Sequence, residues 1–170
     1  DIILIILGEP NSTFSEVLFK FFKSKKFKHY KYKIILIGNK MLLEQQMKKL
    51  KYKMSINEIF DIKKSKKKVI NIINVHYDFK KPFSKISKNS NKYIDDCFNL
   101  GLKLINSHKL NKLINGPISK THFLQKRFPG ITEYVGFKTK TKNQVMLIYN
   151  EKLAVTPLTT HIPINSVSRY

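Results

Sequence analysis

The chain has 170 residues, a formal net charge of +22 and one cysteine, Cys97, so an intrachain disulfide is excluded and a reducing compartment such as the cytoplasm is expected. Arg127 and Arg169 are the only arginines among its 33 basic residues. Recognition of nucleic-acid backbones usually enriches arginine, so we interpret the charge as a solvated lysine surface and expect no nucleic-acid partner. The apolar run at residues 2–7 is too short to cross a membrane, and no membrane partner is expected.

The N-terminal region predicts a strand followed by a helix. Residues 2–7 form a continuous apolar, β-branched run that ends at Gly8, which is typical of a buried parallel strand. Thr13 and Glu16 have the spacing of a capping box, and apolar residues then recur at helical spacing. The order predicted here is strand, tight loop and helix.

Similar patterns continue along the chain. Helices are predicted at residues 41–50 and 89–108, with Cys97 on the apolar stripe of the second and a polar loop at 76–92 before it. Further strands are predicted at residues 33–37, 69–75, 112–115, 145–149 and 153–156. Strands that alternate with helices indicate an α/β protein, with strands 2–7, 33–37, 69–75, 112–115 and 145–149 in a largely shared sheet. We expect one partial α/β domain over residues 1–170, with further chain beyond it.

Four loops carry the unusual residues, at positions 8–10, 115–120, 128–134 and 159–163. Ligands of open α/β sheets gather where strands end, so these loops are the candidates for a site. Ser119 can cap a helix, and Lys120 with free backbone N–H groups can then meet a phosphate, although an ordinary turn with a surface lysine explains the pattern equally well. Thr132, which comes shortly after Gly130, fits either a binding site or an ordinary helix start. Glu9 can likewise be a carboxylate at a helix start with no catalytic role.

His161 follows two threonines and can offer a ring nitrogen to a divalent metal ion. The alternative is a histidine that is hydrogen-bonded within its loop. The sequence has no HxxxH, HxH or CxxC spacing, so further metal ligands would have to come from elsewhere in a longer chain or from another subunit. It also has no GxGxxG or Walker motif, so neither a Rossmann dinucleotide site nor a P-loop is indicated.

Taken in order, these loops resemble the 4-hydroxythreonine-4-phosphate dehydrogenase (PdxA) family. That family has a Gly-(Asp/Glu)-Pro loop after its first strand, then a Gly-Pro-x-x-Lys segment, a Pro-Gly-His-Thr-Glu-Tyr type segment and a Thr-Thr-His-(Leu/Ile)-Pro segment. The matching segments of this chain are residues 8–10, 116–120, 129–134 and 159–163. The resemblance covers the whole chain and identifies it with the N-terminal half of the family.

The resemblance implies a three-layer fold like those of isocitrate and isopropylmalate dehydrogenases, and a cytoplasmic homodimer. It implies oxidation and decarboxylation of 4-phosphooxy-L-threonine in pyridoxal 5'-phosphate (vitamin B6) biosynthesis, with NAD or NADP and a divalent metal ion (Zn, Mg or Co). His161 would be one of three metal-binding histidines, Thr132 would contact the substrate, and Lys120 is a further substrate-binding candidate. Catalytic and cofactor-binding residues are not assigned, and residues 1–170 alone are expected to be inactive.

Two departures from the family pattern leave alternatives open. Ile131 stands where the family has a substrate-contacting histidine, and residues 11–15 lack the glycines that the family has after Pro10. Isoleucine cannot hydrogen-bond, so a dehydrogenase of a related phosphorylated hydroxy acid is one alternative, and an inactive relative is another. A basic nucleic-acid-binding α/β domain is the alternative from a different functional class.

Overall fold

A computed structural model describes residues 1–159 and 162–169. The chain divides into two compact units, Asp1–Arg127 and Phe128–Tyr170, which are described separately below. The sequence predicted one partial α/β domain over residues 1–170, and this remains a prediction for the intact protein. Within the described residues, no helix is both long and apolar enough to cross a membrane.

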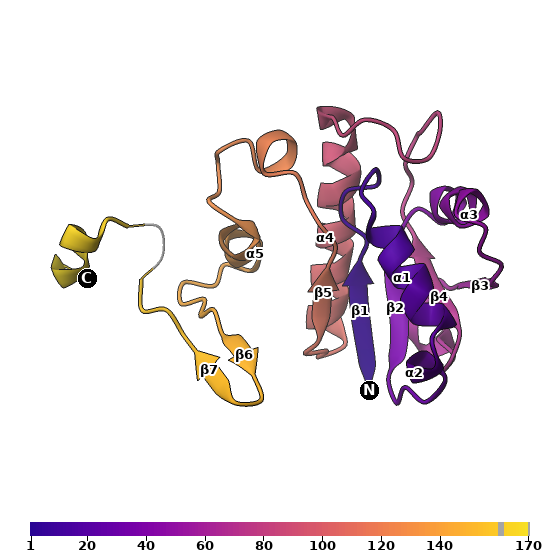
Figure 1. Cartoon of the computed structure of the whole chain (residues 1–170), viewed down its shortest axis with the longest axis horizontal. Helices are drawn as coiled ribbons and strands as arrows, with labels where there is room; N and C mark the ends of the chain where they lie inside the picture. The colour runs from indigo at the N-terminus through magenta and orange to yellow at the C-terminus, as the bar shows by residue number, and fades with distance from the viewer. Residues whose placement is uncertain (160–161, 170) are drawn as a thin grey trace. The chain divides into compact units, whose positions relative to one another are not determined.

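The first unit is built on a five-stranded parallel sheet in the order β3-β4-β2-β1-β5 (Figure 1). Its strands are β1 (Ile2–Ile6), β2 (Lys33–Gly38), β3 (Ile56–Glu58), β4 (Ile70–Asn74) and β5 (Leu113–Asn115). The strands predicted at residues 2–7, 33–37, 69–75 and 112–115 are therefore confirmed as members of one sheet. The three-residue strand β3 was not predicted.

Helices cover both faces of this sheet, which gives three layers. The longer helices are α1 (Phe14–Lys23), α3 (Lys40–Lys49) and α4 (Asn91–Ser107), and the shorter ones are α2 (Lys25–Lys28), η1 (Ile62–Lys64), η2 (Lys88–Ser90) and η3 (Lys120–Leu124). These bounds confirm the predicted helices at 41–50 and 89–108. The α/β class expected from the sequence is confirmed as well.

Successive residues of β1 face opposite layers, as strand geometry requires. Ile5 belongs to a core cluster that includes Phe19 of α1 and Leu43 of α3, so this face is covered by α1 and α3. On the other face, Gly101 of α4 lies so close to Ile6 that an added Cβ would be 2.9 Å from its Cδ1. Apolar burial on both faces explains why the strands read as continuous apolar runs.

The second unit contains α5 (Ile131–Thr139), the strands β6 (Ile148–Asn150) and β7 (Leu153–Val155), and the 3₁₀ helix η4 (Ile164–Arg169). The strands β6 and β7 pair antiparallel in a sheet of their own. The strand predicted at 153–156 is confirmed, but the placement of residues 145–149 in the main sheet is wrong. Only two residues, Glu151 and Lys152, separate β6 from β7, and so short a turn returns the chain as a hairpin.

Candidate functional site

The loops that follow β1, β2, β4 and β5 meet at one edge of the main sheet, because all four strands run parallel. Two of them were singled out from the sequence, at residues 8–10 and 115–120, and the structure brings these two together. The backbone N–H of Glu9 donates to the carbonyl oxygen of Pro117 at 2.8 Å, and the N–H of Gly116 donates to that of Ile6 at 2.7 Å. Gly8 adopts a positive φ of 69° at this contact.

Glu9 is buried at this edge, with only 3% of its surface exposed. Its carboxylate accepts hydrogen bonds from the Ser90 hydroxyl at 2.8 Å and from the Asn11 backbone N–H at 3.1 Å. It therefore joins the loop after β1 to the start of α4 and does not cap α1. The capping box expected from Thr13 and Glu16 is also not formed, since Thr13 makes no side-chain cap bond.

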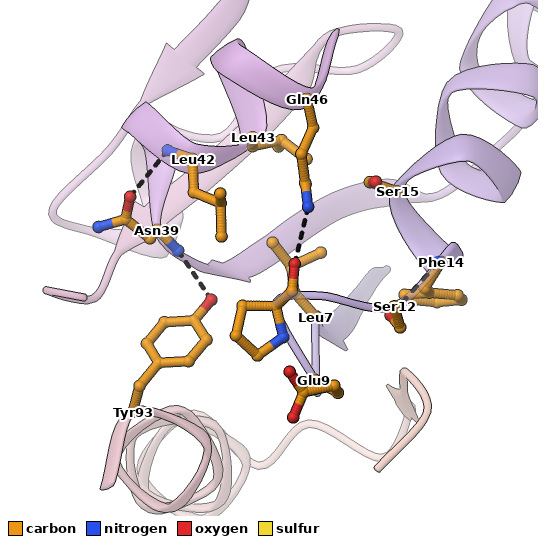
Figure 2. Close-up of a pocket in the computed structure, with 11 residues that line it drawn as sticks. Leu7, Glu9, Ser12, Phe14, Ser15, Asn39, Leu42, Leu43, Gln46 and Tyr93 are labelled. Carbon is orange, nitrogen blue, oxygen red and sulfur yellow. Dashed lines mark hydrogen bonds between the residues drawn. The ribbon is translucent and has the colours of Figure 1, made fainter. Parts of the chain in front are cut away.

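The junction between α1, α3 and α4 is lined by both polar and apolar side chains (Figure 2). The Tyr93 hydroxyl accepts a hydrogen bond from the Asn39 backbone N–H at 3.0 Å, and the Gln46 amide donates to the Pro10 carbonyl at 2.7 Å. Burial raises the pKa of Tyr93 well above its usual value, so the hydroxyl stays neutral. The cavity between these groups measures about 10 Å³. That is room for about one water molecule, so this junction positions the loops and does not hold a substrate.

The hydrogen bonds of Tyr93, Asn39 and Gln46 were not predicted, although the sequence carries a local signal for the role of Asn39. Asn39 follows Gly38 and precedes a helical pattern, which is the arrangement of an N-cap, and its side chain accepts from the Leu42 N–H at 2.8 Å. The roles of Tyr93 and Gln46 have no such signal, because their partners are far away in the sequence.

Lys120 lies at the start of η3, in the first unit. The Ser119 hydroxyl caps this five-residue turn by accepting from the His122 N–H at 3.1 Å, as the sequence predicted. Lys120 itself is exposed and forms no ion pair with any residue the structure describes. A π-helical turn of this length presents too few free N–H groups to form an anion site by itself.

Thr132 lies in the first turn of α5, in the second unit. Together with Glu133 and Lys142 it lines a cavity of about 460 Å³. The other lining residues are Gln144, Val145, Met146, Thr156, Pro157 and Leu158. A cavity of this size fits a small molecule, with a hydroxyl, a carboxylate and an ammonium group at its wall.

His161, the predicted metal ligand, lies outside the described residues. Among residues 1–159 and 162–169, no group of three or more His, Cys, Asp or Glu side chains is placed to hold a metal ion. The described part of the chain therefore offers no metal centre of its own.

Known proteins resemble this chain over most of its length. The family model described as "Pyridoxal phosphate biosynthetic protein PdxA" matches residues 30–170. The 4-hydroxythreonine-4-phosphate dehydrogenase of Sulfurihydrogenibium sp. (strain YO3AOP1) is 32% identical over 165 residues, which cover 96% of this chain and 50% of that protein. The protein of the same name from Aquifex aeolicus (strain VF5) is 28% identical over 170 residues, covering 98% and 51%.

Solved structures of proteins with this name share the fold. The one from Burkholderia phymatum superposes with a TM-score of 0.83 at 23% identity, covering 99% of this chain and 52% of that one. The one from Klebsiella pneumoniae gives 0.82 at 19% identity, covering 97% and 52%. The dehydrogenase-like α/β fold expected from the sequence is thus confirmed. The chain spans about half the length of the curated relatives it matches.

Proposed function

The chain belongs to the PdxA family of pyridoxal phosphate biosynthetic proteins, and from this premise we propose that the intact protein is a 4-hydroxythreonine-4-phosphate dehydrogenase. The proposed reaction transfers a hydride from the hydroxyl-bearing carbon of 4-phosphooxy-L-threonine to NAD or NADP, and the hydroxyl proton is released. The resulting β-keto acid then loses carbon dioxide. We further propose that the protein acts as a cytoplasmic homodimer.

The observation that carries this proposal within the chain is the position of Thr132. Its side chain lines the cavity of about 460 Å³ in the second unit, at the residue where the family pattern has a substrate-contacting threonine. We assign the Thr132 hydroxyl to a hydrogen bond with a substrate oxygen. Lys142 lines the same cavity and supplies positive charge for an anionic group of the substrate. Lys120, in the first unit, is retained as a second candidate for the substrate phosphate.

The metal ion that the family implies has no set of ligands among the described residues. We therefore derive no catalytic step through it and assign only one ligand, His161, as a proposal. Its partners would come from beyond these 170 residues or from a second subunit. His161→Ala in the intact protein is expected to lower the bound metal content, and unchanged content measured by elemental analysis would contradict this assignment.

The test of the dehydrogenase proposal is NAD(P) reduction by the intact protein with 4-phosphooxy-L-threonine. Thr132→Val removes the hydroxyl at nearly constant volume, and we expect kcat/KM to fall by about tenfold or more, the loss of one substrate hydrogen bond. Thr139→Val, in the exposed last turn of the same helix, is the matched control and is expected to leave kcat/KM unchanged. Equal activity of Thr132→Val and wild type would remove Thr132 from the site, and no turnover by wild-type protein would refute the activity.

Ile131 favours a second candidate function, oxidation of a related phosphorylated hydroxy acid. It is the first residue of α5 and is half-buried, where the family pattern has a histidine. Isoleucine offers no hydrogen bond or proton to a substrate. If 4-phosphooxy-L-threonine is the true substrate, Ile131→His should either leave kcat/KM for this substrate unchanged or raise it. A wild-type kcat/KM that is higher for another phosphorylated hydroxy acid would favour the second candidate.

A further inference from the structure

A second cavity, of about 540 Å³, lies in the first unit at the segment between β4 and α4. This segment, residues 75–90, extends beyond the carboxyl ends of the strands (Figure 1). Asn11, from the loop after β1, lines the same cavity, and its side-chain oxygen accepts a hydrogen bond of 2.9 Å from the Ser84 backbone N–H. The cavity is therefore built from two loops at the sheet edge where α/β proteins bind their ligands.

The wall of this cavity carries an excess of positive charge. Lys80, Lys81 and Lys85 line it, all three are exposed, and none forms an ion pair within residues 1–159 and 162–169. Asp78 is the carboxylate among the lining residues, and it lies 3.2 Å from the His76 side chain. The cavity is thus lined by three lysines and one carboxylate, and that carboxylate lies beside the His76 side chain.

Neutral hydrogen-bonding groups complete the wall. Ser84, Ser87 and Asn89 line the cavity just before α4, a helix of 17 residues whose N-terminal end carries a partial positive charge. Tyr77 contributes a hydroxyl. Its pKa is raised by burial and then by the negative charge of Glu9, against the lowering effect of its hydrogen bond with Asn11, so it stays protonated at neutral pH.

Lysines are abundant in this chain, so their number alone does not define a site. A cavity of similar size, about 530 Å³, is lined by Lys48, Lys51 and Lys53 together with Glu44. That cavity lies at the C-terminal end of α3, where the helix dipole is negative, and its lining residues precede the start of β3. Like the cavity between β4 and α4, it is lined by three lysines and one carboxylate, but it lies at a different place in the fold.

From this combination of charge, donors and location, we infer that the cavity between β4 and α4 binds the phosphate group of a small molecule. Lysine ammonium groups and backbone or hydroxyl donors at a sheet edge are the usual partners of phosphate oxygens. The inference uses none of the residues assigned to the substrate or the metal ion, and phosphate binding by this cavity can be measured without the dehydrogenase activity.

The test compares two triple variants of the intact protein, with inorganic pyrophosphate as the probe in isothermal titration calorimetry at constant ionic strength. The pocket variant is Lys80→Gln, Lys81→Gln and Lys85→Gln, and the control is Lys48→Gln, Lys51→Gln and Lys53→Gln. We expect saturable binding that weakens by at least about tenfold in the pocket variant and by less than about twofold in the control. Thermal melts check that both variants are folded, as substitution of exposed lysines should allow.

Titrations with inorganic phosphate and with NAD then distinguish the sources of the phosphate. Weaker NAD binding in the pocket variant alone would identify the dinucleotide as the ligand, whereas unchanged NAD binding with weaker phosphate binding would identify another phosphate carrier. Both outcomes support the site. An equal loss in the two variants, which would report only the overall charge of the protein, or an absence of saturable binding would overturn it.

Discussion

The hydroxyl of Ser90 donates a hydrogen bond of 2.8 Å to the carboxylate of Glu9 across 81 positions of sequence. Glu9 is buried, and its backbone N–H donates to Pro117 at 2.8 Å. One residue therefore ties the loop after β1 both to the residue that precedes α4 and to the loop after β5. The geometry of this edge of the sheet depends on that connection.

Removal of the Glu9 carboxylate should destabilise the protein. Glu9→Ala removes the acceptor of the Asn11 N–H and leaves the buried Ser90 hydroxyl to donate to the Ser87 carbonyl oxygen at 3.0 Å, and we expect the free energy of unfolding to fall by about 1 kcal/mol or more. Glu9→Gln keeps an acceptor oxygen and should lose less. Urea denaturation measures both. The exposed Glu44 gives the control, because Glu44→Ala should change stability by less than about 0.5 kcal/mol, and equal losses at the two sites would contradict the role of Glu9.

The contact between the loops after β1 and β5 should tolerate no side chain at Gly8. Its φ of 69° is strained for any other residue, and an added Cβ would lie against the carbonyl oxygen of Pro117. Gly8→Ala should therefore cost at least about 2 kcal/mol of folding stability. Gly130→Ala is the control, since its Cβ would lie 3.0 Å from Oε2 at the end of the Glu133 side chain, which can shift by rotation, and a loss below about 1 kcal/mol is expected there. Thermal unfolding of both variants checks the difference.

The elements that could be predicted from the sequence are those with a strong local pattern. β1, β2 and β4 are buried on both faces and read as apolar runs, and α4 shows its stripe of Tyr93 and Cys97 directly. β3 was missed because Ile56–Glu58 has no such run and becomes a strand by pairing with β4. The strand predicted at residues 145–149 was placed in the wrong sheet because strand partners depend on connection length and tertiary packing, which apolar pattern alone does not specify.

The same limit applies to the candidate site. The loops at 8–10 and 115–120 were recognisable by their glycines and prolines, and the structure places them in contact. The bond between Tyr93 and Asn39, which are 54 positions apart, follows only from the way α4 lies on the sheet. Thr132 was predicted, and it lines a cavity in the second unit. The role of His161 as a metal ligand stays a prediction, since that residue lies outside the described part.

Asn71 should be the most costly polar residue of the main sheet to replace. It is fully buried in β4, where its amide donates to Ile34 at 2.9 Å and to Lys66 at 2.8 Å and its oxygen accepts from Asn57 at 2.9 Å. Asn71→Leu keeps the number and branching of the side-chain heavy atoms but leaves these groups unpaired, and we expect a loss of at least about 2 kcal/mol in urea denaturation. Asn106→Leu, an exposed position of α4, should change stability by less than about 0.5 kcal/mol. A small effect at Asn71 would mean that water replaces the lost bonds.

The thiol of Cys97 should make stability depend on alkaline pH. Burial raises its pKa from 9.0 to about 12, with a smaller opposing effect from its hydrogen bond with Tyr93. The unfolded chain ionises this thiol near its ordinary pKa while the folded protein keeps it protonated. The contribution is therefore fully present below about pH 9 and is lost as the pH rises towards 12, at up to about 1.4 kcal/mol per pH unit. Cys97→Ala removes this dependence, so the stability of the wild type relative to the variant should decrease between about pH 8 and pH 10. Urea denaturation under reducing conditions at several pH values measures the difference, and a difference that stays constant over this range would show that the buried thiol is not linked to folding in this way.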